Sequence, residues 1–204
     1  MSSGDSPIYL TDLASGDAVP ADLVEEVGDQ QISDWNRYWR PALEETLARL
    51  RANQVPREHW PQTAHWNWDL KSKQIAGLLA FRGFALSAQG VTQGLMRIDL
   101  NHSARHSEQV GKPLVYVEYL EVAPWNRADF STPRYRGVGT ALLTAAVDLS
   151  FQEGFRGRIG LHSLPQAESF YREVCGMSDL GQDEKYDMLR YFEMTSQQAT
   201  TFVE

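Results

Sequence analysis

The sequence contains very little cysteine, since Cys175 is the only one among 204 residues. A single thiol cannot form a disulfide within the chain, and it cannot build a cysteine-rich metal site. No nucleophile motif surrounds Cys175, so we interpret it as a small buried residue. The histidines are scattered as well. His102 and His106 stand four positions apart, but they fall in a predicted loop, where this spacing does not direct both rings to one ion. We therefore predict no metal site.

Long hydrophobic runs are also missing. The most apolar stretch, residues 75–86, is too short to span a bilayer and carries Arg82. The opening residues, MSSGDSPIYL, lack the basic segment and the apolar segment of a secretory signal. We expect a soluble, cytoplasmic protein without a membrane partner.

The chain has no excess of positive charge, because 19 lysines and arginines face 27 aspartates and glutamates, a formal net charge of -8. The average field repels phosphates, which disfavours a general nucleic-acid binder.

Internal repeats and low-complexity linkers are absent too. Six Trp, eight Tyr and eight Phe residues supply enough apolar surface for a core. We expect a single domain over residues 1–204.

The elements that are present can be predicted in order. Apolar side chains recur every three or four positions over residues 33–50, which predicts a helix that Pro41 kinks or splits. Residues 1–30 are polar and mixed, so we predict an irregular lead-in with a short helix near 21–27. Further helices are predicted over 68–79, 138–152 and 166–174, and strands over 81–88 and 91–100 (joined by a hairpin turn at Gln89-Gly90), 114–124, 157–164 and 185–194. This order predicts an α/β (α+β) sheet of mixed strand direction.

The stretch RYRGVG, residues 134–139, places two glycines directly before the predicted helix of 138–152. The first N–H groups of a helix have no partner within it, and the helix dipole adds positive potential there. Glycines let a phosphate approach the backbone, and Arg134 and Arg136 would add charge-assisted contacts. The pattern indicates a phosphate or pyrophosphate site, while an ordinary glycine turn is the alternative for a bare Gly-x-Gly.

Two common phosphate motifs do not fit this stretch. A Walker A loop needs a lysine after its last glycine, but Thr140 follows Gly139 directly. A dinucleotide fingerprint needs a third glycine at the position of Leu142. Another kind of nucleotide-binding protein stays a weaker alternative.

The surroundings of the glycines carry a resemblance. The ordered set resembles the GNAT superfamily of acyl-CoA-dependent N-acyltransferases. Its phosphate motif is matched by Arg134, Gly137 and Gly139, its Val-x-Pro strand end by Val122-Ala123-Pro124, and its helix motif by Phe170-Tyr171 followed by Gly176-Met177. The resemblance covers roughly residues 81–194. Two features depart from the family pattern: residues 125–133 look inserted, and the spacing from Tyr171 to Gly176 is one residue longer.

The resemblance implies a fold, a co-substrate and a reaction. A GNAT-like domain would use residues 1–80, helical or irregular, as the acceptor side, 81–194 as the sheet and acetyl-CoA-binding core, and 195–204 as a tail. Acetyl-CoA would donate its acetyl group directly to a primary amine of a small molecule or protein. The cofactor-binding residues would be Leu120 and Val122 beside the pantetheine arm, and Arg134, Arg136, Gly137, Val138, Gly139 and Thr140 around the pyrophosphate. Whether the chain forms a homodimer is left open.

Acetyl transfer to an amine needs a base for the amine and a proton for the departing thiolate. Glu118 and Glu121 lie on the predicted central strand, and their spacing puts them on opposite faces. We favour Glu118, because some family branches carry an acidic residue four positions before the valine of Val-x-Pro. Glu121, His162 and a water molecule remain alternatives for the base. The resemblance assigns Tyr171 as the acid for the thiolate.

The tryptophan-rich segment at residues 59–69 has two interpretations. Its rings could line an acceptor pocket for a cationic amine, with Asp69 pairing to the amine. Alternatively, these side chains pack in the core and brace the first helices. A further alternative for the whole protein is a CoA-binding sensor or interaction module that does not catalyse.

Overall fold

The computed structural model describes residues 7–128 and 132–204. Its strands are β1 (Ile8–Asp12), β2 (Ala18–Val24), β3 (Phe81–Ala88), β4 (Val91–Ser103), β5 (Pro113–Val122), β6 (Tyr135–Arg136), β7 (Ile159–Ser163), β8 (Ser178–Asp183) and β9 (Leu189–Met194). Hydrogen-bonded neighbours follow the order β6-β1-β2-β3-β4-β5-β7-β9-β8. The β5–β7 pair is parallel, whereas β1–β2, β2–β3 and β7–β9 are antiparallel. The predicted mixed α/β sheet is confirmed.

The α-helices are α1 (Asp29–Asp34), α2 (Arg40–Ala52), α3 (Trp68–Ile75), α4 (Val138–Gln152) and α5 (Ser196–Val203). The described residues divide into two structural units. Unit 1 contains residues 7–76, 83–95, 121–128 and 132–141, and unit 2 contains residues 77–82, 96–120 and 142–204. The single-domain organisation stays a prediction.

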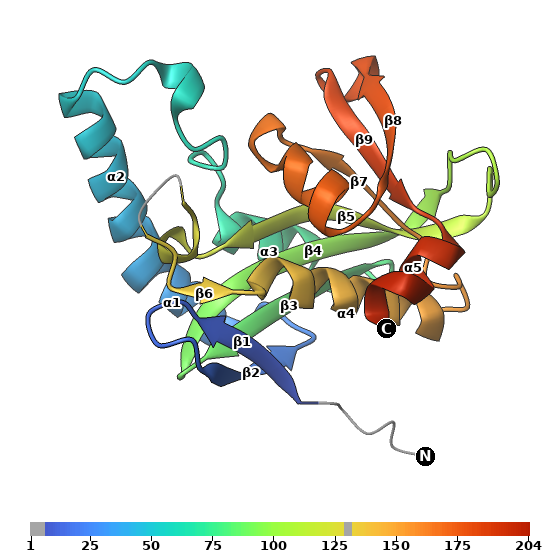
Figure 1. Cartoon of the computed structure of the whole chain (residues 1–204), viewed down its shortest axis with the longest axis horizontal. Coiled ribbons are helices and arrows are strands. Elements are labelled where there is room, and N and C mark those ends of the chain that lie inside the picture. The colour runs from blue at the N-terminus through green and yellow to red at the C-terminus, as the bar shows by residue number, and fades with distance from the viewer. Residues whose placement is uncertain (1–6, 129–131) are drawn as a thin grey trace. The chain divides into compact units, whose positions relative to one another are not determined.

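The lead-in of unit 1 is a β-hairpin, so the predicted irregular segment with a helix near 21–27 is wrong. In Figure 1, β1 and β2 run side by side, with β6 against the other edge of β1. Leu10 and Ala21 are buried while their neighbours along each strand are more exposed. The segment is polar because only one of its faces is buried, and β2 pairs with β3 along four residues.

The predicted turn at Gln89-Gly90 is confirmed in the same unit. The two residues have φ of 51° and 74°, the left-handed values that a tight two-residue hairpin needs. They join β3 to β4, as the sequence indicates.

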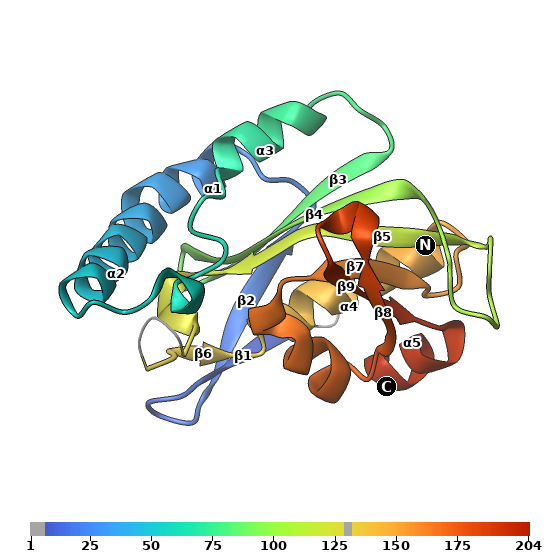
Figure 2. The same cartoon turned by 90° about the horizontal axis from the view of Figure 1, so that it is seen from above.

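The first helical run is continuous from α1 to α2, with a π-helical turn at Trp35–Trp39 between them (Figure 2). Arg40 N–H donates to the carbonyl of Trp35, five residues back, and Pro41 lies at the start of α2. Proline has no N–H to donate and crowds the preceding turn, so the wider turn relieves the helix at this point. The predicted disturbance at Pro41 is thus confirmed.

Two side chains of this helical run bond to the start of β4. The Asp34 carboxylate accepts from the N–H and the hydroxyl of Thr92 at 2.9 and 2.8 Å, and from the Gln30 amide at 3.0 Å. The Trp39 indole donates to the Thr92 carbonyl at 3.0 Å. Asp34 and Trp39 are 5% and 2% exposed, so these bonds form away from water.

We expect Asp34→Ala to lower the free energy of unfolding by about 2–3 kcal/mol, because it leaves a buried N–H and a hydroxyl without their acceptor. For a chain of this length the melting temperature should fall by about 5–10 °C. Thermal unfolding measures the loss. Asp29→Ala, an exposed aspartate of the same helix, should cost much less, and equal losses in both variants would contradict the assignment.

Unit 2 contains one strand and one helix that the sequence interpretation missed. β8 was not predicted, because SDLGQD is polar and the strand pairs only with β9, with an irregularity between Asp179 and Gln182. The predicted tail, 195–204, is helix α5. Its capping box was readable in the sequence: the Thr195 hydroxyl accepts from Gln198 N–H, and the Gln198 side chain accepts from Thr195 N–H.

Candidate active site

The turn before α4 has the backbone geometry that the glycines predicted. Gly137 has φ of 102°, a value that side chains rarely allow, and its carbonyl accepts the helical hydrogen bond from Ala141 N–H at 2.9 Å. Among the described residues, no acceptor is recorded for the N–H groups of Val138, Gly139 and Thr140. N–H groups without a partner at a helix start are the kind of donors that bind an anion.

The two arginines of this turn differ in their contacts. Arg134 donates to the Gln89 side chain at 2.6 Å and lies 4.7 Å over the Tyr135 ring. Arg136 is exposed on the two-residue strand β6. Both arginines precede the N–H groups of Val138, Gly139 and Thr140 in this turn. Arg134 already contacts Gln89 and Tyr135.

The end of β5 carries the predicted pantetheine-binding residues. The recorded β5–β7 pairing runs from Val115–Ile159 to Val117–Leu161. β5 itself continues to Val122, and every residue from Glu118 onward is partly exposed, including Leu120 and Val122. Backbone groups beyond the paired segment are the kind that an extended ligand can use as a strand edge.

The favoured base, Glu118, is held in an ion pair within unit 2. Arg97 Nε and Nη2 donate to its two carboxylate oxygens at 2.6 and 2.9 Å. The Arg97 side chain is 8% exposed and that of Glu118 26%. Both carboxylate oxygens of Glu118 are thus engaged by a buried guanidinium.

Glu121, three residues further along β5, has a different environment in unit 1. Burial raises the pKa of its carboxyl group, against hydrogen bonds from Thr63 and Trp68 and the charge of Arg127, which lower it. The Trp68 indole donates to Oε2 at 2.6 Å, and Arg127 in turn donates to Thr63 at 2.9 Å. A carboxylate with a raised pKa and fixed neighbours suits a general base.

A small cavity of unit 1, about 10 Å³ in volume, lies beside Glu121. Its lining includes Trp35, Trp39, Trp66, Glu121, Val122 and Arg127. Trp68 is 1% exposed and packs edge-on against Trp66, so the tryptophan-rich segment supplies both core and pocket wall. The pairing of Asp69 with a substrate amine is not favoured, because Lys73 Nζ lies 2.7 Å from its carboxylate.

Tyr171 lies in a π-helical turn, Phe170–Val174, in unit 2. Cys175 N–H donates to the Phe170 carbonyl, five residues back, so this turn absorbs the extra residue between Tyr171 and Gly176. Tyr171 is 7% exposed, and its hydroxyl has no recorded hydrogen bond to another described residue. Burial raises the pKa of Tyr171, with the nearby Cys175 adding to the effect, so the phenol stays protonated at neutral pH.

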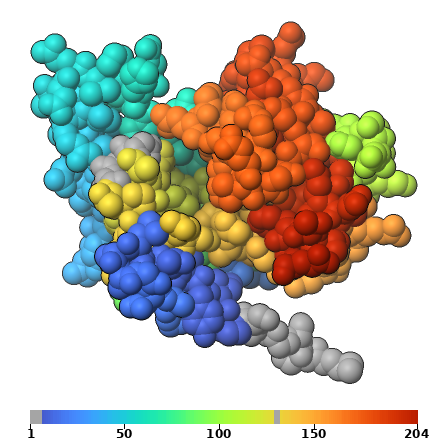
Figure 3. Space-filling model, viewed as in Figure 1, coloured from blue at the N-terminus to red at the C-terminus, as the bar shows by residue number. Residues whose placement is uncertain are grey.

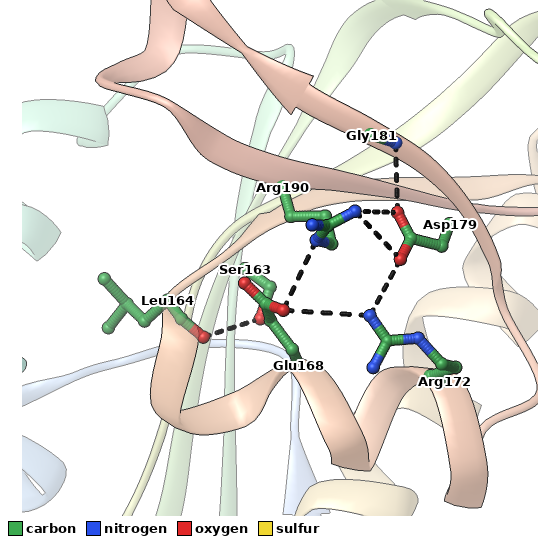
Figure 4. A network of polar contacts seen from close by, with 7 residues as sticks. All are labelled: Ser163, Leu164, Glu168, Arg172, Asp179, Gly181 and Arg190. Carbon is green, nitrogen blue, oxygen red and sulfur yellow. Dashed lines mark hydrogen bonds and ion pairs between the residues drawn. The ribbon is translucent and has the colours of Figure 1, made fainter.

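A ring of charges ties this helical turn to the last hairpin (Figure 4). Arg172 Nη2 lies 2.7 Å from Asp179 on β8, and Arg190 on β9 lies 3.0 Å from the same carboxylate. Glu168 closes the ring, 3.3 Å from Arg190 Nε and 3.7 Å from Arg172. Gly181 N–H donates to Asp179 as well. These alternating charges connect the segment around Tyr171 to β8 and β9.

Solved structures of known proteins share this architecture. The PaiA N-acetyltransferase from Thermoplasma acidophilum, determined in complex with coenzyme A, matches with a TM-score of 0.54 and 11% identity, over 86% of this chain and 98% of that chain. The GNAT domain of S. lividans PAT matches with 0.54 and 14%, over 93% and 95%. A putative GNAT acetyltransferase from Desulfovibrio desulfuricans matches with 0.54 and 12%, over 86% and 99%.

The protein has the GNAT fold. No family model matches the sequence. No curated protein matches it either. At identities of 11–14% the likeness establishes the fold, and the site has to be judged from this chain's own residues.

Within the GNAT fold, His162 is a poor candidate for the base. Its Nδ1 lies 2.8 Å from the Tyr116 hydroxyl and its Nε2 3.1 Å from Asp183, so both ring nitrogens are engaged. The side chain is 2% exposed, and Tyr186 stacks on it with centroids 3.7 Å apart. Arg105 also pairs with Asp183. His162 therefore belongs to a buried polar cluster.

This cluster predicts acid sensitivity. Burial lowers the pKa of His162, and the hydrogen bond from Arg105 lowers the pKa of Asp183 to about 2. For both groups the folded state binds protons less readily than the unfolded state. Stability should therefore be full near pH 7 and fall as the pH drops below about 6.5, and again below about 4. Urea unfolding at several pH values measures this, and His162→Gln should flatten the first decline.

His59→Gln is the control for that measurement, because the His59 side chain is 67% exposed. It should leave the pH dependence of stability as in the wild type. An unchanged profile for His162→Gln would show that other groups cause the decline.

The remaining candidates of the sequence analysis are placed as follows. Cys175 is 4% exposed and burial raises its pKa to about 12, which confirms it as a small buried thiol. Over residues 7–128 and 132–204, no three potential metal ligands gather, and no helix is long and apolar enough to cross a membrane. Of the predicted insertion 125–133, residues 129–131 lie outside the described residues. Trp125 and Asn126 both donate to the Gln93 side chain.

Proposed function

We propose that this protein is an N-acetyltransferase that moves an acetyl group from acetyl-CoA to a primary amine of a small molecule or protein. The observation that carries the proposal is the start of α4. Three consecutive N–H groups there have no recorded partner among the described residues, next to a glycine with φ of 102° and two arginines. GNAT structures that match over most of the chain, one of them holding coenzyme A, support it.

The residues present fit coenzyme A. The N–H groups of Val138, Gly139 and Thr140 would bind the pyrophosphate. Arg134 and Arg136 would add charge-assisted contacts. Leu120 and Val122 would lie along the pantetheine arm, where the β5 backbone extends beyond its recorded pairing with β7. The bound co-substrate supplies an activated acetyl thioester.

We assign the base to Glu121 in preference to Glu118. Glu121 combines a raised pKa with a place in the pocket wall, whereas Glu118 is neutralised by Arg97. The Glu121 carboxylate would accept a proton from the amine, directly or through a water molecule, so that the nitrogen lone pair can form the new C–N bond. Glu118 stays the prediction from the family resemblance.

We assign the acid to Tyr171. When the C–S bond breaks, the sulfur leaves with the electron pair, and the phenol would donate its proton to that thiolate. The raised pKa keeps this proton in place at neutral pH, and the hydroxyl has no recorded competing partner in the described residues. The charge ring of Glu168, Arg172, Asp179 and Arg190 would keep the turn in position (Figure 4).

Calorimetric titration with acetyl-CoA tests the proposal, followed by a CoA-release screen with amines, amino acids, aminoglycosides and peptides. We expect binding in the micromolar range and release of free CoA with at least one amine class. Arg136→Gln should weaken acetyl-CoA binding by several fold, since it removes one charged contact. Absence of binding at millimolar acetyl-CoA would reject the proposal.

A second candidate is a CoA-binding sensor or interaction module without catalysis. The ion pair between Arg97 and Glu118 favours it, because it neutralises the carboxylate that the family resemblance designates as base. Acetyl-CoA binding without CoA release over the whole amine panel would support this candidate.

A further inference from the structure

Unit 2 contains a cleft of about 250 Å³ with no role in the acetyl transfer proposed above. Three segments line it: the loop before β5, the turn before β7 and the start of α5. In Figure 3 they come to the surface beside one another, in light green, light orange and red. Its charged lining residues are Glu108, Lys112, Arg156 and Arg158. Three cations against one carboxylate give these lining residues a net charge of +2, in a protein that is acidic as a whole.

Arg158 is the buried cation of this cleft. Its residue is 7% exposed, and its Nε donates to the Pro113 carbonyl at 2.9 Å, which fixes the plane of the guanidinium. No acceptor is recorded for its two terminal nitrogens among the described residues, although the side chain lines the cleft. Burial and the charge of Arg156 lower the pKa of Arg158, with Glu193 opposing them. A buried guanidinium without a direct anionic partner is a costly feature that a bound anion would relieve.

Arg156 is held beside it in a strained conformation. Its φ of 58° lies in the left-handed region, which is unfavourable for a residue with a side chain. The next residue, Gly157, also has a positive φ, and a Cβ there would lie 2.6 Å from the Ala199 Cβ of α5. The turn is thus packed directly against α5, and an arginine occupies a position where glycine or asparagine would be easier.

The loop that brings Gln109 and Lys112 to the cleft is also fixed. The fully buried Glu193 carboxylate accepts from the N–H groups of Arg105 and His106 and from the Gln109 side chain. Lys112 N–H then donates to the Gln109 carbonyl. The loop that carries Lys112 is therefore anchored, and the Glu193 oxygens are engaged by partners other than Arg158.

The start of α5 adds neutral donors. Thr195 caps the helix with its own hydroxyl, and the first recorded helical bond is from Ala199 N–H to the Thr195 carbonyl. The N–H groups of Ser196 and Gln197 have no recorded acceptor in the described part of the chain, and both residues line the cleft. Donors of this kind suit the oxygens of a tetrahedral anion.

We propose that this cleft is a binding site for a phosphate dianion, carried by a small phosphorylated molecule or present as free phosphate. The net charge of +2 on the lining residues matches a dianion, and the planar Arg158 group matches its oxygens. Lys112 directly precedes β5, and Glu118 lies six residues further along the strand. At about 3.3 Å per residue, the phosphate would sit about 20 Å from the Glu118 end of that strand. The residues of this cleft are different from those of the α4 turn, so the proposed phosphate site is a second anion site.

Inorganic phosphate is the probe for the first experiment. Isothermal titration should show binding to the wild type, and phosphate should raise its melting temperature more than acetate or chloride at equal ionic strength. Arg156→Gly should weaken phosphate affinity about tenfold while leaving the protein at least as stable, because it removes a charge and relieves the backbone strain. Arg158→Gln should weaken it to a similar or larger extent. Lys185→Gln, an exposed cation of the same unit, is the control and should change nothing.

The source of the phosphate is decided by competition. Phosphate that still binds at saturating acetyl-CoA, with affinity that depends on Arg156 and Arg158, establishes a site for a separate phosphorylated ligand. If instead coenzyme A competes with phosphate, and Arg158→Gln weakens coenzyme A but not 3′-dephospho-coenzyme A, the same site binds the co-substrate's 3′-phosphate. Equal affinity for phosphate in the wild type, Arg156→Gly and Arg158→Gln would overturn the proposal.

Discussion

Glu121→Gln is expected to lower the rate of acetyl transfer by about 10²- to 10⁴-fold, the range for loss of a general base. The substitution keeps the shape of the side chain and an acceptor oxygen for the Trp68 indole, but it removes the group that accepts the proton. Acetyl-CoA binding should be retained, since the predicted pyrophosphate donors are backbone groups of the α4 turn. Steady-state kinetics with the best amine of the screen, together with calorimetry, separates the two effects.

The pH dependence gives an independent test of the same residue. Because burial raises the pKa of Glu121, activity should decline on the acid side at a higher pH than for an ordinary glutamate near 4.3. Carboxylate is the active form, so activity rises as the pH increases through that pKa. In Glu121→Gln this acid limb should disappear from the residual activity.

Glu118→Gln is the matched control, since it is the same substitution three residues earlier on β5. We expect a smaller effect on turnover and a loss of stability, because Arg97 keeps its buried charge with a weaker partner. If Glu118→Gln abolishes turnover while Glu121→Gln retains it, the roles are reversed and the assignment from the family resemblance stands.

Tyr171→Phe is expected to reduce kcat by about 10²-fold or more, through loss of the proton for the departing thiolate. The change should leave stability nearly unaltered, because the hydroxyl has no recorded hydrogen bond to the described residues and the ring keeps its contacts with Phe170 and Phe192. A large loss of rate with an unchanged melting temperature would be hard to explain by packing alone.

Tyr9→Phe serves as control for the tyrosine experiment, because Tyr9 is 57% exposed and has no assigned role. It should match the wild type in both rate and stability. Full activity of Tyr171→Phe would remove the acid role from Tyr171, and water would then have to protonate the thiolate.

The charge ring of Glu168, Arg172, Asp179 and Arg190 can be tested with the same kinetic and stability measurements. Asp179→Asn removes one charge that pairs with both Arg172 and Arg190 (Figure 4). If the ring positions Tyr171, this variant should lower kcat more than it raises the KM for acetyl-CoA. A change in stability alone would assign the ring to folding.

Local patterns predicted several elements because their causes are local. The two residues Gln89-Gly90 specify a tight hairpin by their backbone preferences, and the apolar period of 138–152 specifies α4. The glycine turn before α4 was predicted for the same reason, since Gly137 is suited to its positive φ. The disturbance at Pro41 follows from the missing N–H of proline.

Elements with a distant cause were missed or misjudged. The segment of β1 and β2 looks polar and irregular in sequence, with a short helix predicted near 21–27. Its strand form comes from the pairing of β1 with β2 and of β2 with β3. β8 exists because β9 offers it an edge. Tertiary pairing overrides a weak local propensity in each case.

The sequence by itself determined the GNAT-like order of motifs, the anion-binding turn at 134–140, and the two carboxylates and one tyrosine worth testing. Only the tertiary structure decided which partners surround those groups. It pairs Arg97 with Glu118, and it places the Glu121 carboxylate 2.6 Å from the Trp68 indole. These contacts join residues 21 and 53 positions apart. The protonation behaviour of a carboxylate depends on such neighbours and on its distance from water, and no pattern along the chain records either.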